Sequence, residues 1–263
     1  MFYAIYERLR QKHRTVPFPK SEPVLPERLR GRPLVKRERC AAGCATCLAV
    51  CPTGALQATK EGPRIDLGRC LFCGACGRAC PAGTVEFTRD YRLATRRRED
   101  LLVHDQTLRL AEALETRTRR LFGRSLKLRQ VSAAGCNACE ADLNVLTTVV
   151  FDLQRFGIEF VASPRHADGV CVTGPVSENM REALLKTYDA VPDPKLVIAV
   201  GSCAIAGGPF AGLPAVHNGA TNILPVDLFV PGCPPHPYTT LDGLLRLLGR
   251  RPEVKRDDGR GRR

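Results

Sequence analysis

CLFCGACGRACP, residues 70–81, carries four cysteines at gaps of two, two and three residues, with a proline after the last. Gaps of two residues let three neighbouring thiolates wrap the corners of one [4Fe–4S] cluster, and the fourth cysteine of such a run ligates a different cluster. The motif therefore requires a second, similar motif elsewhere in the chain.

The second motif precedes the first. Residues 40–56 read CAAGCATCLAVCPTGAL, and residues 70–85 read CLFCGACGRACPAGTV. Duplication of a half-domain explains this likeness, and each half then supplies the fourth ligand to the cluster of the other half. We expect two [4Fe–4S] clusters with two ligand sets: Cys40, Cys44, Cys47 and Cys80 (set 1), and Cys70, Cys73, Cys76 and Cys51 (set 2).

The first motif has one irregularity, a gap of three residues between Cys40 and Cys44. Gly43 can adopt the backbone conformations needed to absorb the extra residue, so we expect an intact cluster. A three-iron cluster, or no cluster at set 1, is the alternative.

The composition fits an intracellular metalloprotein. The chain has 263 residues with 44% apolar content, enough for one or two domains, and eight of its 13 cysteines fall within residues 40–80. Residues 1–14 lack the continuous apolar core of a signal peptide, so we expect a reducing cytosol and metal ligation in place of disulfides. Residues 196–216 are uncharged but rich in Gly and Pro, which indicates a buried strand and loop and not a membrane span.

The net charge of +13 is concentrated at the two ends. Residues 1–39 hold 11 Lys and Arg against 4 Asp and Glu, and residues 250–263 hold 7 against 3. This distribution favours an anionic membrane surface or an acidic partner. No nucleic-acid-binding motif accompanies the charge, so we expect no nucleic-acid partner.

The pattern divides the chain into five parts, namely a basic arm (1–38), a two-cluster domain (39–90), a connecting helix (91–124), a second domain (125–250) and a disordered basic tail (251–263). The start of the arm mixes aromatic and basic residues, which is typical either of a disordered terminus or of an interfacial or partner-docking helix. The connecting helix is expected from leucines that recur at helical spacing, Leu110, Leu114 and Leu121.

Apolar strands alternate with helices in the second domain. The strands are expected at 126–131, 158–162, 169–173, 196–200 and 228–230, and the helices near 140–151, 178–190 and 238–248. Such alternation predicts a mostly parallel sheet covered on both faces.

Four more cysteines follow strands of this sheet: Cys136, Cys139, Cys203 and Cys233 (set 3). Loops at the carboxyl ends of parallel strands converge on one site, so we expect a third [4Fe–4S] cluster there. Zinc is the alternative metal, although zinc modules usually bind through two local cysteine pairs.

Four segments of the second domain carry a family resemblance: AGCNACEADL (134–143), SPRHADGVCVTGPV (163–176), AVGSCAIAGGPF (199–210) and VDLFVPGCPPHP (226–237). They resemble the small subunit of membrane-bound [NiFe] hydrogenases of the energy-converting, formate-hydrogenlyase type, and more distantly the 20 kDa cluster-bearing subunit of complex I. Residues 1–90, with RGRPLVKRERC (30–40), resemble the two-cluster ferredoxin subunit of the same complexes. The chain resembles two neighbouring subunits fused into one.

The resemblance implies a fold, a role and partners. The fold would be an α+β bacterial-type 2[4Fe–4S] ferredoxin domain followed by an α/β flavodoxin-like domain with a mostly parallel sheet. Set 3 would hold the cluster nearest the active site of the complex. That active site, a Ni–Fe centre, would lie on a large partner subunit, so the chain would be a non-catalytic subunit relaying electrons through three [4Fe–4S] clusters. Further partners would be membrane subunits and an electron donor or acceptor protein, with the chain cytoplasmic and peripheral on the inner face of the cell membrane.

An equivalent subunit of a complex I-like quinone oxidoreductase is the alternative. Complex I proteins carry two adjacent cysteines in the first ligand loop, whereas this chain has Cys136-x2-Cys139, the hydrogenase arrangement. A cysteine hydrolase built on Gly201-Ser202-Cys203 lacks patterned His and Asp partners, and a free-standing ferredoxin carrier is a further alternative.

The remaining candidate residues have two interpretations each. Glu140 can tune the cluster or relay protons, or it can stabilise a helix N-terminus. Cys171 lies within an apolar strand and is expected to be a small buried residue and not a ligand. Arg165 and His166 can face the partner subunit or lie in a surface loop, and His217 and His236 are expected to be loop residues.

Overall fold

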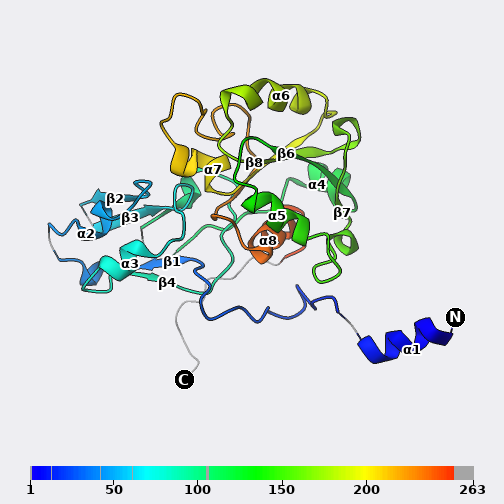
Figure 1. The fold of residues 1–263 in the computed structure, drawn as a ribbon, viewed down its shortest axis with the longest axis horizontal. Coiled ribbons are helices and arrows are strands. Elements are labelled where there is room, and N and C mark those ends of the chain that lie inside the picture. The colour runs from blue at the N-terminus through cyan, green and yellow to red at the C-terminus, as the bar shows by residue number, and fades with distance from the viewer. Residues whose placement is uncertain (1, 13, 42, 61, 105–106, 252–263) are drawn as a thin grey trace.

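The computed structural model describes residues 2–12, 14–41, 43–60, 62–104 and 107–251. Figure 1 shows a smaller lobe formed by the two-cluster domain, a larger lobe formed by the second domain, and helix α1 (Phe2–Gln11) standing apart at the end of an extended arm. Of the basic tail expected at 251–263, only Arg251 lies within the described residues.

The two-cluster domain is built from two similar halves. In each half a short helix is followed by a strand. Its elements are β1 (Pro33–Val35), η1 (Arg37–Arg39), α2 (Thr46–Ala49), β2 (Leu56–Thr59), β3 (Gly62–Asp66), α3 (Ala75–Ala79), β4 (Val85–Phe87), η2 (Glu99–Leu101) and β5 (Leu102–Val103). Strands β1 and β4 pair antiparallel, and β2, β3 and β5 form a three-stranded antiparallel sheet.

The second domain contains a five-stranded parallel sheet in the order β10-β9-β8-β6-β7. The parallel sheet predicted from the β–α alternation is confirmed. Its strands are β6 (Leu126–Ser132), β7 (Ile158–Phe160), β8 (Gly169–Thr173), β9 (Leu196–Val200) and β10 (Leu228–Val230). Between and after the strands lie α5 (Ala138–Val145), η3 (Leu153–Phe156), η4 (Pro164–His166), α6 (Glu178–Asp189), α7 (Ser202–Ala206), η5 (Gly208–Phe210) and α8 (Pro237–Leu247).

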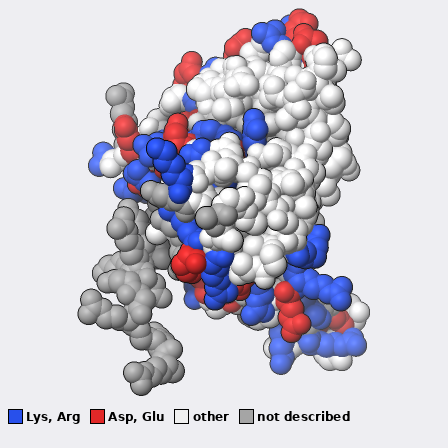
Figure 2. Space-filling view, turned by 90° about the vertical axis from the view of Figure 1, so that its left-hand side faces the viewer, with Lys and Arg blue, Asp and Glu red and all other residues white. Residues whose placement is uncertain are grey.

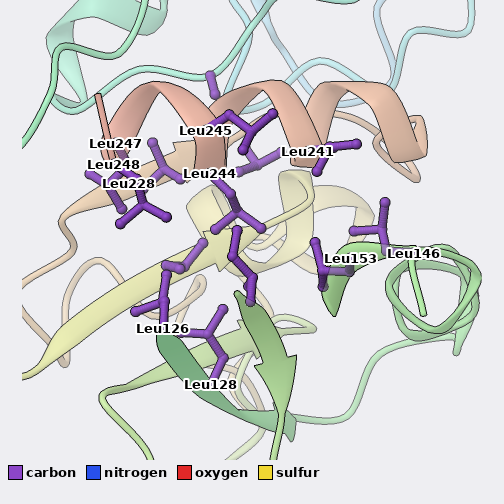
Figure 3. Close-up of a cluster of buried hydrophobic side chains, with 14 of the residues drawn as sticks. Leu126, Leu128, Leu146, Leu153, Leu228, Leu241, Leu244, Leu245, Leu247 and Leu248 are labelled. Carbon is purple, nitrogen blue, oxygen red and sulfur yellow. The ribbon is translucent and has the colours of Figure 1, made fainter. Parts of the chain in front are cut away.

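Both faces of this sheet are covered, which explains why every residue of β8 and β9 is buried. On one face, leucines of α8 pack on Leu126, Leu128 and Leu228 of the sheet, with Leu146 and Leu153 beside them (Figure 3). Each fully buried leucine contributes about 1.5–3 kcal/mol to stability. On the other face, α6 inserts Leu184 against Val170, Val172 and Val197.

The two-cluster domain covers the rest of that second face. Ile65, Leu67 and Phe72 share one apolar cluster with three residues of the second domain, Ala199, Ile205 and Phe229. The cluster is continuous across the boundary, so the two domains pack as one body.

The helix predicted within residues 91–124 is much shorter than expected. Only α4 (Thr116–Phe122) is helical among the described residues between η2 and β6. Thr95 exchanges two backbone hydrogen bonds with Phe229 of β10, of 3.0 and 2.8 Å. Pairing with the sheet and burial of Leu93 and Ala94 between the two domains hold this segment extended, so tertiary contacts override the leucine periodicity.

The part of the arm that follows α1 lies against the second domain. Phe18 is buried among Tyr91 and Tyr238, with ring centroids 6.0 and 5.3 Å away. Arg251 lies over the Phe18 ring and pairs with the buried carboxylate of Asp242 at 3.0 Å. The disordered-terminus interpretation is therefore wrong for this part of the arm.

Candidate iron–sulfur cluster sites

The cysteines of set 1 come together around α2 and the end of α3. Cys47 lies in α2, while Cys40 and Cys80 directly follow η1 and α3. Burial raises the pKa of the Cys47 thiol, and the neighbouring charges of Cys80, Cys40 and Cys44 raise it further. Gly43 adopts φ of +75°, the left-handed conformation expected to absorb the extra residue of this loop.

The cysteines of set 2 line one cavity of about 290 Å³. Burial raises the pKa of Cys70 to about 12 and that of Cys76 to about 11, and the charges of Cys51 and Cys73 contribute to both shifts. Four thiols whose charges repel one another in this way are poorly suited to remain as free thiolates. They are suited to a shared cationic metal group, which removes the repulsion.

The two crossing cysteines, Cys51 and Cys80, occupy equivalent turns. The backbone N–H four residues later donates to each Sγ, from Ala55 at 3.2 Å and from Thr84 at 3.3 Å. Burial raises the pKa of Cys51, but the N–H donors outweigh burial and lower it overall. The Thr84 donor likewise lowers the pKa of Cys80. Both turns favour the thiolate, the form that binds metal.

The cysteines of set 3 converge at the carboxyl ends of the parallel strands. Cys136 and Cys139 follow β6, Cys203 lies in α7 after β9, and Cys233 follows β10. Burial raises the pKa of Cys139, with further contributions from the charges of Cys203, Glu140, Cys233 and Cys136. Burial also raises the pKa of Cys203 to about 11.

Two glycines leave room at set 3. A Cβ on Gly201 would lie 2.6 Å from Sγ of Cys139, and a Cβ on Gly208 would lie 2.6 Å from Sγ of Cys203. Both glycines have positive φ, +90° and +56°. The backbone is therefore shaped around the sulfur atoms, and the donor set fits a cluster with four thiolate ligands.

The three sets lie in series. The charge of Cys47 in set 1 raises the pKa of Cys76 in set 2, and the charge of Cys73 in set 2 raises that of Cys233 in set 3, in each case behind the larger effect of burial. Set 2 is therefore the neighbour of both other sets.

The spacing of the cysteines bears on the choice of metal. A four-cysteine zinc site requires Sγ atoms about 3.8 Å apart, as follows from tetrahedral Zn–S bonds of about 2.3 Å. Within the described part of the chain, no three His, Cys, Asp or Glu side chains converge closely enough for a single ion. The thiolates of a four-iron cluster lie further apart, so the arrangement suits a cluster better than zinc.

Glu140 lies beside set 3 but is engaged in structure. Its buried carboxylate accepts hydrogen bonds of 2.6 Å from the hydroxyls of Ser132 and Thr173. Burial raises its pKa, but the two hydroxyls outweigh burial and lower it overall. The carboxylate is held ionised and joins α5 to β6 and β8.

The other candidate residues lie apart from the cysteine sets. Cys171 is buried in β8, as predicted. Arg165 and His166 are exposed in η4. His217 contacts Glu178 at 2.5 Å, and His236 accepts a hydrogen bond from the backbone N–H of Tyr238 at the start of α8.

Sequence reasoning missed two residues that position the sites. Ser202, considered only as part of a hydrolase motif, is buried and donates to the carbonyl of Cys70. Arg30 donates through Nε to the carbonyl of Phe72, between two cysteines of set 2, at 2.5 Å. Its place in RGRPLVKRERC, just ahead of the cysteine repeat, was the only signal.

Fold and sites together define a class of protein, iron–sulfur proteins in which a dicluster ferredoxin-like domain is joined to an α/β domain with its own cysteine site. Residues 39–84 match the family described as 4Fe-4S dicluster domain. Residues 136–247 match the family described as NADH ubiquinone oxidoreductase, 20 Kd subunit. The chain belongs to this 20 kDa subunit family.

Curated relatives agree with this membership. The chain is 44% identical over 126 residues to formate hydrogenlyase subunit 7 of Escherichia coli K12, covering 48% of this chain and 49% of that relative. It is 41% identical to "Probable membrane-bound hydrogenase subunit mbhJ" of Pyrococcus furiosus, covering 49% of this chain and 77% of the relative. It is 46% identical to an NADH-quinone oxidoreductase subunit of Clostridium beijerinckii, covering 43% and 68%. The chain thus spans about half the length of the formate hydrogenlyase subunit.

Proposed function

We propose that this chain is an electron-transfer subunit of a membrane-associated oxidoreductase complex, with sets 1, 2 and 3 as the ligands of three [4Fe–4S] clusters. When bound, the clusters would supply one-electron redox chemistry. The single observation that carries the proposal is the serial arrangement of the three cysteine sets, with charge interactions linking set 1 to set 2 and set 2 to set 3.

The chain's own residues support such a role. Both end sets have an exposed cysteine, Cys44 in set 1 and Cys136 and Cys233 in set 3, where partner proteins can approach. Cys70 and Cys76 of the middle set are buried. The shared apolar cluster between the domains excludes water around set 2 and keeps the three sets at fixed separations.

We further assign the second domain to the flavodoxin-like class. Counted within the domain, its strand order is 2-1-3-4-5, the order of that class, and set 3 lies at the carboxyl ends of the strands, where such sheets bind their cofactors. Residues 39–90 and 125–250 are the two proposed domains.

The proposed partner is a large subunit with a Ni–Fe active site, to or from which electrons pass at set 3, in a complex of hydrogenase or formate-hydrogenlyase type. The relatives named as a formate hydrogenlyase subunit and a membrane-bound hydrogenase subunit support this partner, as does the spacing Cys136-x2-Cys139. Viewed from the side of the two-cluster domain, the molecule presents a broad uncharged area with Lys and Arg gathered beside it, a surface suited to protein partners (Figure 2).

The alternative is the same role in a complex I-like quinone oxidoreductase, supported by the relative from Clostridium beijerinckii. In either case membrane subunits of the complex and an electron donor or acceptor protein are proposed partners. No helix among the described residues has the length and apolar content to cross a bilayer. The proposed location is the inner face of the cell membrane, as a peripheral subunit.

Isolation of the native complex through a tag on this chain tests the proposal. We expect a large partner subunit that contains nickel and a complex that turns over hydrogen with a redox dye, while the isolated chain does neither. A nickel-free partner that reduces quinone would establish the alternative. Hydrogen turnover by the isolated chain would contradict the non-catalytic role.

A further inference from the structure

Helix α1 has an apolar face that the described part of the chain leaves uncovered. Phe2, Ile5, Tyr6 and Leu9 recur at i, i+3, i+4 and i+7 and so form one stripe. No residue of α1 is buried, and Phe2 and Leu9 are 86% and 73% exposed. In Figure 1 the helix stands away from both domains. A folded amphipathic helix needs a surface to cover such a stripe.

The segment that follows α1 is fixed to the second domain. Thr15 Oγ1 donates to the carbonyl of Val149 at 2.8 Å, and the Val16 N–H donates to the carbonyl of Val150 at 2.9 Å. The Arg155 guanidinium donates to the carbonyls of Val16 and Phe18, each at 2.8 Å. The position from which α1 leaves the body is therefore defined.

At that position the body has an exposed apolar patch of its own. Residues 145–150, here called the valine loop, expose Val145, Val149 and Val150, with Val149 at 71%. The loop lies between α5 and η3, and two of its carbonyls accept the hydrogen bonds that hold the arm. The valine loop and the stripe of α1 are therefore neighbouring apolar surfaces on two different elements.

Basic residues accompany the stripe. Residues 1–14 include Arg8, Arg10, Lys12 and Arg14 against one acidic residue, Glu7. On a helical wheel, Arg8 lies on one side of the stripe and Arg10 on the other. Glu7 lies away from the stripe, where it pairs with Arg10 at 3.5 Å.

We infer that α1 and the valine loop together form a surface that binds the headgroup region of an anionic lipid bilayer. Aromatic and aliphatic residues on one face with Arg on both flanks are what an interfacial helix presents to anionic lipids. A groove on a partner protein would take the helix alone, whereas a bilayer surface covers both the helix and the loop. The inference rests on the proposed membrane association and names the surface responsible.

Flotation with lipid vesicles tests the inference, using the full chain purified with its clusters. We expect binding to vesicles of phosphatidylglycerol and phosphatidylethanolamine, and weaker binding to phosphatidylcholine vesicles or at high salt. The double variant Ile5→Ser/Leu9→Ser should bind the anionic vesicles about tenfold or more weakly. The double variant Arg8→Gln/Arg10→Gln should lose about tenfold on anionic vesicles and little on neutral ones.

Leu213→Ser is the matched control, because Leu213 is also an exposed leucine (52%) but lies in the loop after η5, in the other part of the second domain. It should bind like the wild type. Absence of binding to anionic vesicles, or equal binding by Ile5→Ser/Leu9→Ser and the wild type, would overturn the inference. So would a dimer that the same variant dissociates, since a second copy would then cover the stripe. Iron content, measured on each sample, tests the proposed electron-transfer role separately from lipid binding.

Discussion

Ser202 Oγ donates a hydrogen bond of 2.6 Å to the carbonyl oxygen of Cys70, across the boundary between the two domains. Ser202 directly precedes Cys203 of set 3, and Cys70 is the first cysteine of the set 2 motif. Both residues are buried. One short contact therefore links the ligand loops of neighbouring sites and fixes the separation between them.

Replacing Ser202 with Ala should lower the free energy of unfolding by about 1–3 kcal/mol, because the Cys70 carbonyl would remain buried without its donor. Urea unfolding, followed by the loss of cluster absorption, measures the change. Thr187→Ala is the control, since Thr187 makes only an exposed hydrogen bond within α6. Equal midpoints for the two variants would show that the contact does not hold the domains together.

Anaerobically purified protein should contain about 12 Fe and a similar amount of acid-labile sulfide, four of each for every cysteine set. Elemental analysis of the Cys44→Ala variant should return about 8 Fe if the loop of set 1 holds a full cluster in the wild type. Zinc in place of iron, or about 4 Fe in folded wild-type protein, would contradict the assignment. About 8 Fe in the wild type would place the failure at the irregular gap before Cys44.

The second domain could be predicted from the sequence almost element by element, because its strands are continuous apolar runs bounded by Gly and Pro. Strands β8, β9 and β10 begin and end at the expected residues. The grouping of Cys136, Cys139, Cys203 and Cys233 followed from strand direction alone, since parallel strands place their carboxyl ends at one edge.

Contacts between distant segments were the part that the sequence could not reveal. Residues 91–95 carry no strand pattern of their own and become extended only by pairing with Phe229. The role of Ser202 depends on the packing of one domain on the other, as does the position of Arg30. Such pairings come from the summed apolar contacts of the whole body and have no local periodicity.

Replacing His236 with Asn should reduce the loss of stability at acid pH. Burial lowers the pKa of His236, and its Nδ1 accepts the Tyr238 N–H, which only the unprotonated nitrogen can do. The unfolded chain therefore binds the proton more readily. The stabilisation is fully present above about pH 6.5 and is lost as the pH falls below that value toward the folded pKa.

Asn keeps an acceptor at the helix N-cap but does not titrate. Between pH 7 and 5, the free energy of unfolding should fall less for the variant than for the wild type, by about 1 kcal/mol or less because the side chain is only partly buried. His166→Asn, at an exposed site, is the control and should follow the wild type. A parallel decrease for wild type and His236→Asn would contradict the prediction.

Replacing Cys203 with Ala should remove or degrade the cluster of set 3 while leaving sets 1 and 2 reducible. Cys203 is the lone ligand from α7, and its neighbours Ser202 and Ala204 cannot replace a thiolate. Cys171→Ala is the matched control, because Cys171 is a buried cysteine of the same domain outside every set. It should retain about 12 Fe, whereas Cys203→Ala should fall to about 8 Fe, or somewhat more if a three-iron cluster remains. EPR of the reduced proteins should show the signals of sets 1 and 2 in both variants. In the assembled complex, Cys203→Ala should abolish turnover with a redox dye, because electrons that enter at set 1 cannot pass beyond set 2. Wild-type turnover without the set 3 signal would show that this site lies off the electron path, and iron loss in Cys171→Ala would show that Cys171 is a ligand after all.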